Sequence, residues 1–176
     1  MLDSLTKLLA LTVVLFLASC SSTGDAQNAN TASNVTPAAT PSKNFTSADI
    51  AKLKWIEGTW RGMDGDKPFY ERYKVLDDAI AVESLKEDGS VDGEAERFEL
   101  KGGEFGKGAG DNRSAASEIT DTYVQFVPAT PGAKRNSFRF EQQSGGTWIA
   151  LLEWPASGDK PAGRKLYRME PWQPNK

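Results

Sequence analysis

The hydrophobic period changes inside residues 55–62, which read Trp-Ile-Glu-Gly-Thr-Trp-Arg-Gly. Up to Ile56, apolar residues recur at the spacing of one helical face, at Ile50, Leu53 and Ile56. After it, apolar and polar residues alternate with the period of two that is typical of strands. Gly58 lies at the change, where glycine commonly ends a helix. The segment therefore predicts a short helix that leads directly into a first strand.

Short alternating segments separated by turn residues follow this point. Asp88-Gly89 and Gly145-Gly146 are typical of tight hairpin turns. Many short strands with regular turns indicate an all-β sandwich or barrel. The predicted strands are 59–63, 69–75, 79–85, 96–101, 123–127, 137–142, 148–154 and 165–170.

Two segments depart from simple alternation. Residues 103–117 are mostly Gly, Ala, Ser, Asp and Asn, and they predict a long mobile loop, with a short strand at 103–106 as the alternative. Residues 148–154 are apolar on both faces, which is typical of a strand that is covered on both sides. One cover would be the barrel interior. The other would be the opening helix or, as the less favoured alternative, a partner.

Residues 55–62 resemble the opening of lipocalin-like barrels, in which a short helix leads into Gly-x-Trp on the first strand. A bacterial lipocalin-like domain family of unknown function has a similar Trp-Leu-x-Gly-x-Trp opening, and the likeness covers most of residues 50–170. It implies a mainly β fold: a lipocalin-like antiparallel β-barrel preceded by one short helix. The chain ends a hairpin earlier than the family pattern, so an incompletely closed barrel is an alternative.

The first residues have the pattern of a bacterial secretion signal. Lys7 precedes an apolar run over 8–17, which as a helix spans only about 15 Å, half of a bilayer core. The run is therefore a signal segment and not a transmembrane helix. Residues 17–20, Leu-Ala-Ser-Cys, resemble the lipobox of bacterial lipoproteins. The resemblance implies a signal peptide over 1–19 and fatty acyl chains such as palmitate on Cys20.

A tether follows the predicted lipid anchor. Residues 20–44 are rich in Ser, Thr, Asn, Ala and Pro and hold too little apolar area to order themselves, so we expect a flexible linker and a barrel domain over 45–176. Several acyl chains hold a protein stably on a membrane. Ser21 and Ser22 differ from an inner-membrane retention signal. In a Gram-negative host this pattern predicts a place in the cell envelope, on the outer membrane and facing the periplasm.

Composition excludes several kinds of function. The 176 residues include no histidine and one cysteine, and their formal net charge is −3. Without histidine there is no Ser-His-Asp group, no His-ligated haem and no His-containing zinc site. Without a basic excess there is no electrostatic footprint for nucleic acid. The sequence therefore implies no cofactor, no metal site and no nucleic-acid partner, and it assigns no catalytic residue.

One structural pair is expected at the base of the barrel. The lipocalin resemblance implies that Trp60 on the first strand stacks with Arg168 on the last one. Such a cation–π pair contributes about 0.5–2 kcal/mol. Its role would be structural.

Inward-facing residues are the candidates for a ligand site. Glu71 shares a strand face with Phe69, Tyr73 and Val75, which makes it the best candidate among Glu71, Glu83, Glu99 and Glu153 for a carboxyl group that faces the interior. Aromatic side chains on the strands line a pocket or, as is more common in small barrels, fill a solid core. The candidate ligand-binding residues are Glu71, Tyr73, Tyr123, Phe138, Phe140 and Trp148.

Three functions remain open at this level. The first is a membrane-tethered module that binds a small apolar or amphipathic ligand. The second is an envelope lipoprotein with a filled core that acts through a protein partner, which the sequence does not identify. The third, less favoured, is a histidine-free enzyme that uses a carboxyl group. A cavity inside the barrel would favour ligand binding, and a solid core would favour a protein partner. A buried glutamate beside a tyrosine would favour an enzyme.

Overall fold

The computed structural model describes residues 40–42, 44–130, 132–133 and 135–174. The predicted signal peptide, Cys20 and most of the predicted linker lie outside the described residues. The chain already contacts the barrel before the first helix. The backbone N–H of Ser42 donates to the carbonyl of Ala116 at 2.9 Å, and that of Phe45 donates to the carbonyl of Gly103 at 2.9 Å.

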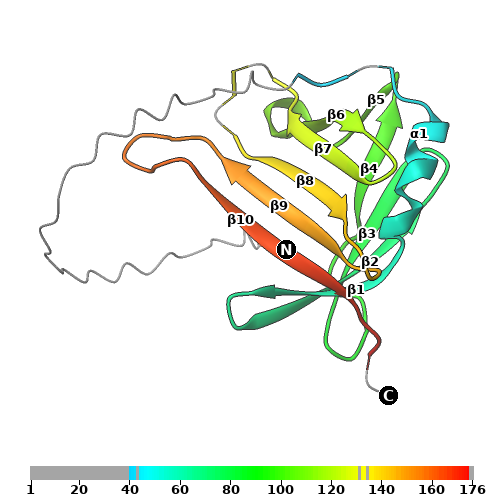
Figure 1. The fold of residues 1–176 in the computed structure, drawn as a ribbon. Helices are drawn as coiled ribbons and strands as arrows, with labels where there is room; N and C mark the ends of the chain where they lie inside the picture. Colours follow the sequence, from blue (N-terminus) through cyan, green and yellow to red (C-terminus); the bar gives the residue numbers. More distant parts are fainter. Residues whose placement is uncertain (1–39, 43, 131, 134, 175–176) are drawn as a thin grey trace, which may run out of the picture. The chain divides into compact units, whose positions relative to one another are not determined.

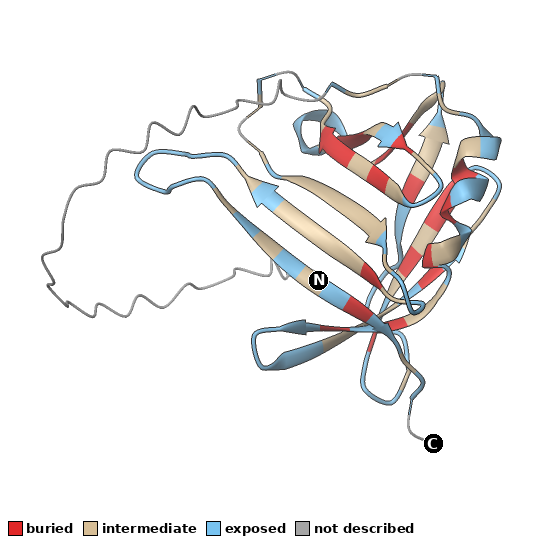
Figure 2. Ribbon diagram, viewed as in Figure 1, coloured by how far each residue is buried: buried red, intermediate tan, exposed pale blue. Residues whose placement is uncertain are grey.

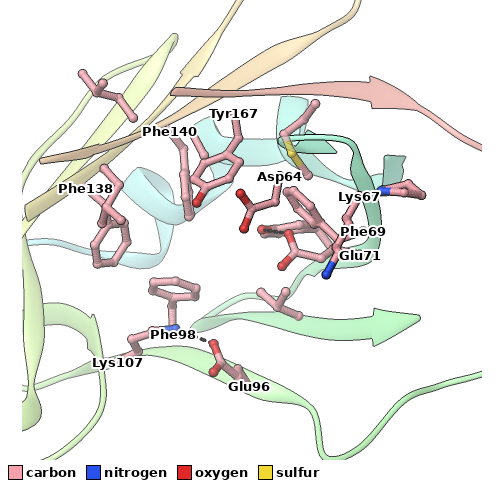
Figure 3. A pocket seen from close by; sticks show the side chains of 17 residues that line it. Asp64, Lys67, Phe69, Glu71, Glu96, Phe98, Lys107, Phe138, Phe140 and Tyr167 are labelled. Carbon is pink, nitrogen blue, oxygen red and sulfur yellow. Dashed lines mark hydrogen bonds and ion pairs between the residues drawn. The ribbon is translucent and has the colours of Figure 1, made fainter. Parts of the chain in front are cut away.

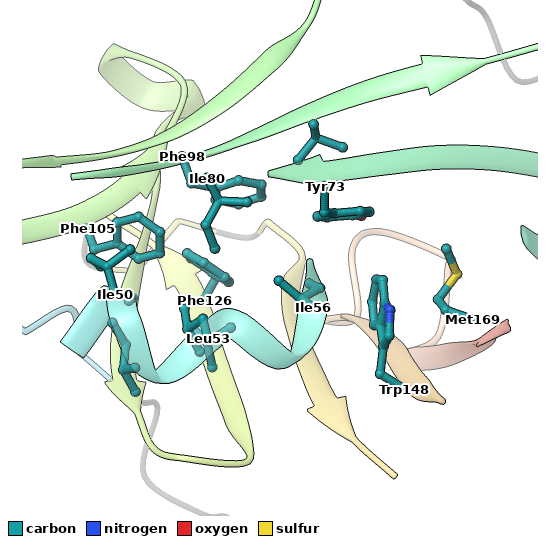
Figure 4. Close-up of a cluster of buried hydrophobic side chains, with 14 of the residues drawn as sticks. Ile50, Leu53, Ile56, Tyr73, Ile80, Phe98, Phe105, Phe126, Trp148 and Met169 are labelled. Atoms are coloured by element: carbon teal, nitrogen blue, oxygen red, sulfur yellow. The ribbon is translucent and has the colours of Figure 1, made fainter. Parts of the chain in front are cut away.

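The opening helix forms where the sequence predicts it. Helix α1 (Ser47–Ala51) continues as a 3-10 helix, η1 (Lys52–Ile56). The backbone N–H of Thr46 donates to the Asp49 carboxylate at 2.9 Å, which satisfies a donor that the first helical turn leaves free. Ile50, Leu53 and Ile56 are buried on one face. This face closes one end of the barrel (Figure 4).

Ten antiparallel strands form a closed barrel in which every strand pairs with its sequence neighbour and β1 also pairs with β10 (Figure 1). The lipocalin-like architecture with its preceding helix is therefore confirmed, and the alternative of incomplete closure is wrong. The strands are β1 (Gly58–Asp64), β2 (Lys67–Val75), β3 (Ala79–Leu85), β4 (Glu96–Lys101), β5 (Glu104–Lys107), β6 (Ser114–Ile119), β7 (Tyr123–Pro128), β8 (Ser137–Gln142), β9 (Trp148–Trp154) and β10 (Gly163–Pro171).

The long loop predicted at 103–117 is wrong, whereas the short strand considered at 103–106 is confirmed by β5. The residues of this segment supply strands that complete the barrel. The segment contains β5, a 3-10 turn η2 (Gly110–Asn112) and the start of β6. Its small residues reflect close approach of two strands. A Cβ at Gly106 would lie 2.2 Å from the carbonyl oxygen of Ser114, so no larger residue fits there. Phe105 has no exposed surface at all and joins the core.

The seam between β1 and β10 is short. Only Trp60–Pro171 and Arg61–Glu170 pair the two strands. Residues 62–64 of β1 continue their pairing with β2, and β10 continues its pairing with β9. Beyond these two residue pairs, β1 and β10 are each hydrogen-bonded to one neighbouring strand only.

The barrel is filled at one end and hollow at the other. Figure 2 shows buried residues concentrated on β6, β7 and the strands beside the helix, whereas β8, β9 and β10 are mostly half-buried or exposed. At the filled end, the rings of Phe98, Phe105 and Phe126 lie over the buried helix face. Trp148 forms the floor between the filled end and the hollow end, because it packs against both Trp55 and Tyr73.

Strand β9 is covered on its inner face only. Trp148 and Ala150 belong to the interior, while the neighbours of Leu151 across the sheet are Arg139 and Leu166. Leu166 is 54% exposed. The helix closes the end of the barrel and does not cover this outer face, so the expected helix cover is wrong. The apolar outer positions remain partly open to solvent.

Candidate functional site

A cavity of about 520 Å³ occupies the hollow end of the barrel (Figure 3). Side chains from β1, β2, β3, β4, β5, β8, β9 and β10 line it, so nearly the whole wall contributes. Aromatic rings dominate this lining. They are those of Phe69, Tyr73, Phe98, Phe138, Phe140 and Tyr167.

Strand β2 supplies the polar centre of the cavity. Successive side chains of a strand alternate between its faces, so Phe69, Glu71 and Tyr73 point to the same side. The Tyr73 hydroxyl donates a hydrogen bond of 2.8 Å to the Glu71 carboxylate. Tyr73 is only 5% exposed and packs edge-on against Phe140 and Trp148. Tyr73 is therefore fixed in position, and it holds Glu71 in turn.

The apolar surroundings change the acidity of this pair. Burial raises the pKa of Glu71 above its usual value of 4.5, and the hydrogen bond from Tyr73 opposes that rise in part. Burial also raises the pKa of Tyr73 well above 10.0, and the neighbouring Glu71 charge adds to that effect. Tyr73 therefore stays a hydrogen-bond donor at neutral pH. Glu71 is a carboxyl group that holds its proton more tightly than a solvated glutamate does.

Charged side chains surround the rim of the cavity, and two of the lysines there form ion pairs. Lys107 forms an ion pair with Glu96, and its ammonium group lies 5.3 Å from the ring centre of Phe98. Lys165 forms an ion pair with Asp64 and so connects β10 to the end of β1 beyond their last backbone pair. Lys67 also lies on the rim. Figure 3 shows Asp64 and Glu71 both directed into the space between the strands.

Four of the six predicted ligand-binding residues line one cavity: Glu71, Tyr73, Phe138 and Phe140. The other two lie elsewhere. Tyr123 is on the outer face of β7, where the Arg139 guanidinium stacks 3.7 Å from its ring centre. Trp148 is fully buried in the floor, with its ring centre 5.2 Å from that of Phe140. Trp148 therefore supports cavity-lining rings without lining the cavity.

The predicted Trp60–Arg168 pair is wrong. Trp60 is buried, and its indole N–H donates to the carbonyl of Ile56 at 2.7 Å. Arg168 is exposed on β10 next to Met169, which is buried. Because neighbouring residues of a strand face opposite sides, Arg168 points away from the interior that contains Trp60. The ring centre of Trp148 lies 5.9 Å from that of Trp60 in an edge-on contact, so an aromatic side chain takes the place of the expected cation.

Of the four glutamates considered from the sequence, only Glu71 lines the cavity. Glu83 pairs with Arg72 at 2.6 Å, and Glu99 pairs with Lys101 at 2.6 Å. Glu153 is exposed. The period-two argument that favoured Glu71 is therefore confirmed.

Several lining residues escaped the sequence analysis. Tyr167 and Met169 occupy alternate positions of β10 and line the cavity. This alternation is visible in the sequence but is weak, because charged residues surround it. The composition of residues 103–117 predicts a loop at Lys107, whereas the structure places it on the barrel wall. Its partner Glu96 is eleven positions away and meets it only because β4 and β5 form a hairpin.

Comparison of the chain with protein-family models and with curated proteins finds no match. Within the described ranges, no group of three or more Cys, Asp or Glu side chains is arranged to hold a metal ion. No helix in that same part of the chain has the length and hydrophobicity needed to cross a membrane. The assignment of function therefore depends on the chemistry of the cavity.

Proposed function

We propose that this protein is a lipoprotein, tethered to a cell-envelope membrane through Cys20, whose barrel binds a small apolar or amphipathic ligand. The observation that carries the proposal is the cavity of about 520 Å³ with its aromatic lining. Small-molecule sites typically measure roughly 300–1,000 Å³, are mostly apolar and contain a few placed polar groups. The Glu71–Tyr73 pair provides such polar groups in an otherwise apolar wall.

The filled-core alternative receives less support. Side chains fill the end of the barrel that the helix closes, but the opposite end is hollow. Large apolar residues with high exposure are scattered over the described surface: Met63, Val91 and Leu166. Single exposed apolar residues are normal and do not define a protein-docking patch.

The test is to fill the cavity. Ala150 lines it and lies opposite both Tyr167 and Phe140 across the sheet, so Ala150→Trp would occupy the space. Leu166→Trp on the outer face is the matched control, because it adds an indole outside the cavity. We expect native mass spectrometry to detect a bound envelope component on the wild type and on Leu166→Trp but not on Ala150→Trp. A wild-type protein that takes up no species from envelope extract would contradict the proposal.

A second candidate function is acid–base catalysis in the same cavity. The observation in its favour is the 2.8 Å hydrogen bond between Tyr73 and a carboxyl group whose pKa burial raises. A carboxyl group with a raised pKa is the usual kind of general acid or base in an active site. Under this alternative the bound component would be converted to a product, and Glu71→Gln would retain the component unchanged. Recovery of the same unmodified species from both proteins would argue against catalysis.

A further inference from the structure

The positively and negatively charged side chains around the cavity differ in whether they form ion pairs. The ammonium groups of Lys107 and Lys165 are already neutralised by Glu96 and Asp64 at the rim. Glu71, in contrast, forms no ion pair among the described residues, and it lies on the cavity wall. Lys67 also has no ion pair among the described residues, but it is exposed to solvent at the rim. Glu71 is therefore the charged group that remains available to a ligand within the aromatic lining.

Glu71 also has unused hydrogen-bonding capacity. One of its oxygens, Oε2, accepts the hydrogen bond from Tyr73. Its other oxygen, Oε1, accepts no hydrogen bond from the described part of the chain, and it is not among the buried atoms that lack a partner. A carboxylate has about four acceptor sites, and an ionised one has no donor. The natural complement is a ligand group that donates hydrogen bonds and carries positive charge.

The rings beside Glu71 favour the same kind of ligand. Phe69 is two positions away on the same face of β2, and it meets Tyr167 edge-on with ring centres 5.6 Å apart. Tyr73 and Phe140 make a second edge-on contact at 6.3 Å. The faces of aromatic rings attract cations electrostatically, most strongly where water is excluded. A carboxyl group among such rings is suited to an ammonium group attached to an apolar body.

We propose that the cavity selects an organic cation, a molecule with an apolar body and a protonated amine that is held by Glu71 among the rings of Phe69, Tyr73 and Tyr167. This inference rests on the proposed ligand-binding function and narrows it to one head-group class. Lys107 and Lys165 are ion-paired and Lys67 is exposed to solvent, so the cavity is a poor site for a fatty carboxylate.

The experiment compares three probes that share one apolar chain: octylamine, octanol and octanoate. Each is titrated calorimetrically into the purified wild-type protein at neutral pH. We expect octylamine to bind about tenfold more tightly than octanol, because charge-assisted hydrogen bonds and cation–π contacts are both stronger than their neutral counterparts. Octanoate should bind more weakly than octanol.

Two variants locate the selectivity. Glu71→Gln keeps an acceptor for the Tyr73 hydroxyl and should lose the preference for octylamine while it still binds octanol. Glu153→Gln, an exposed change on the same barrel, should leave the ranking as in the wild type.

The outcomes separate the two proposals. Octanol or octanoate bound as tightly as octylamine by the wild type would overturn the cation inference and leave ligand binding intact. Failure of all three probes to bind would count against both. A preference for octylamine that survives in Glu71→Gln would show that Glu71 does not hold the amine.

Discussion

At the scale of the residue, Glu71 links the fold to the chemistry. It occupies a strand position whose side chain must enter the barrel, and there it meets one fixed donor, Tyr73. The charged groups of neighbouring elements that act on it are Glu96 from β4, which raises its pKa, and Lys107 from β5, which lowers it. Burial has the largest effect, so the net shift of its pKa is upward.

This shift predicts a dependence of stability on pH. Glu71 ionises near 4.5 in the unfolded chain and at higher pH in the folded barrel, so the folded state keeps a proton that the unfolded state releases. The contribution of Glu71 to the free energy of unfolding therefore falls as pH rises through this window and stays low above it. We expect the melting temperature of Glu71→Gln, relative to wild type, to increase as the pH rises above 4.5.

The control for this prediction is Glu153→Gln, because Glu153 is exposed. Its melting temperature relative to wild type should not follow the same curve. Asp64 and Lys67 also line the cavity and are unchanged in both variants. A pH-independent difference between Glu71→Gln and wild type would mean that Glu71 ionises alike in both states.

At the scale of the element, close approach of strands explains the segment that sequence reasoning placed outside the sheet. Periodicity methods look for large apolar side chains, and β5 and β6 carry Gly, Ala and Ser where their backbones meet. Gly106 does not adopt a positive φ, so its role is to leave space and not to permit an unusual turn. A glycine of this kind has no local signature that separates it from a loop glycine.

Gly106→Ala is therefore expected to destabilise the barrel. The new Cβ would lie 2.2 Å from the Ser114 carbonyl oxygen, a backbone atom that can move only if the strands separate. We expect a loss of about 2 kcal/mol in the free energy of unfolding, measured by urea denaturation.

Gly163→Ala provides the matched control. Gly163 also lacks a positive φ, but its added Cβ would meet the side chain of Trp154, 2.6 Å away. That side chain lies at the end of β9 and can turn aside, so the loss should be clearly smaller. Equal losses for the two variants would contradict the explanation from backbone contact.

The strands that line the cavity differ in how well the sequence predicts their inward-facing residues. Alternation along β2 was sufficient to place Glu71 and Tyr73 on one inner face, because that relation is local. Their companions Phe98 and Tyr167 come from β4 and β10, and which rings meet across a barrel depends on strand register. Register depends on turn lengths and on strands that the sequence did not predict. For the same reason the expected partner of Trp60 was placed on the wrong face.

At the scale of the whole molecule, one end of the barrel is a packed core and the other contains the cavity. The helix, its apolar partners and the tryptophan floor form a solid block that secures the fold. The hollow end contains the titratable groups and the paired rim charges. The proposed tether would hold this module at a membrane surface without contributing to the cavity.

The proposed anchor gives a prediction for the complete protein. Cys20→Ser removes the thiol that would carry the acyl chains. We expect the variant to move from the membrane fraction to the soluble fraction of the host cell, because stable attachment needs more than one acyl chain. Fractionation followed by immunoblotting measures this, with Ser22→Ala as the control that keeps the cysteine. Membrane retention of Cys20→Ser would argue for another means of attachment.

The short seam between β1 and β10 has a consequence for how the molecule is made. Each strand from β2 to β10 pairs with the strand just before it in the sequence, so the wall can assemble progressively from its N-terminal strand. Closure must wait for β10, because the free edge of β1 pairs only through Trp60 and Arg61, with Pro171 and Glu170 of that strand. Until that moment the nascent sheet has two unsatisfied edges, which are templates for aggregation. Glu170 and Pro171 at the end of β10 thus complete the protection of the sheet against self-association during folding.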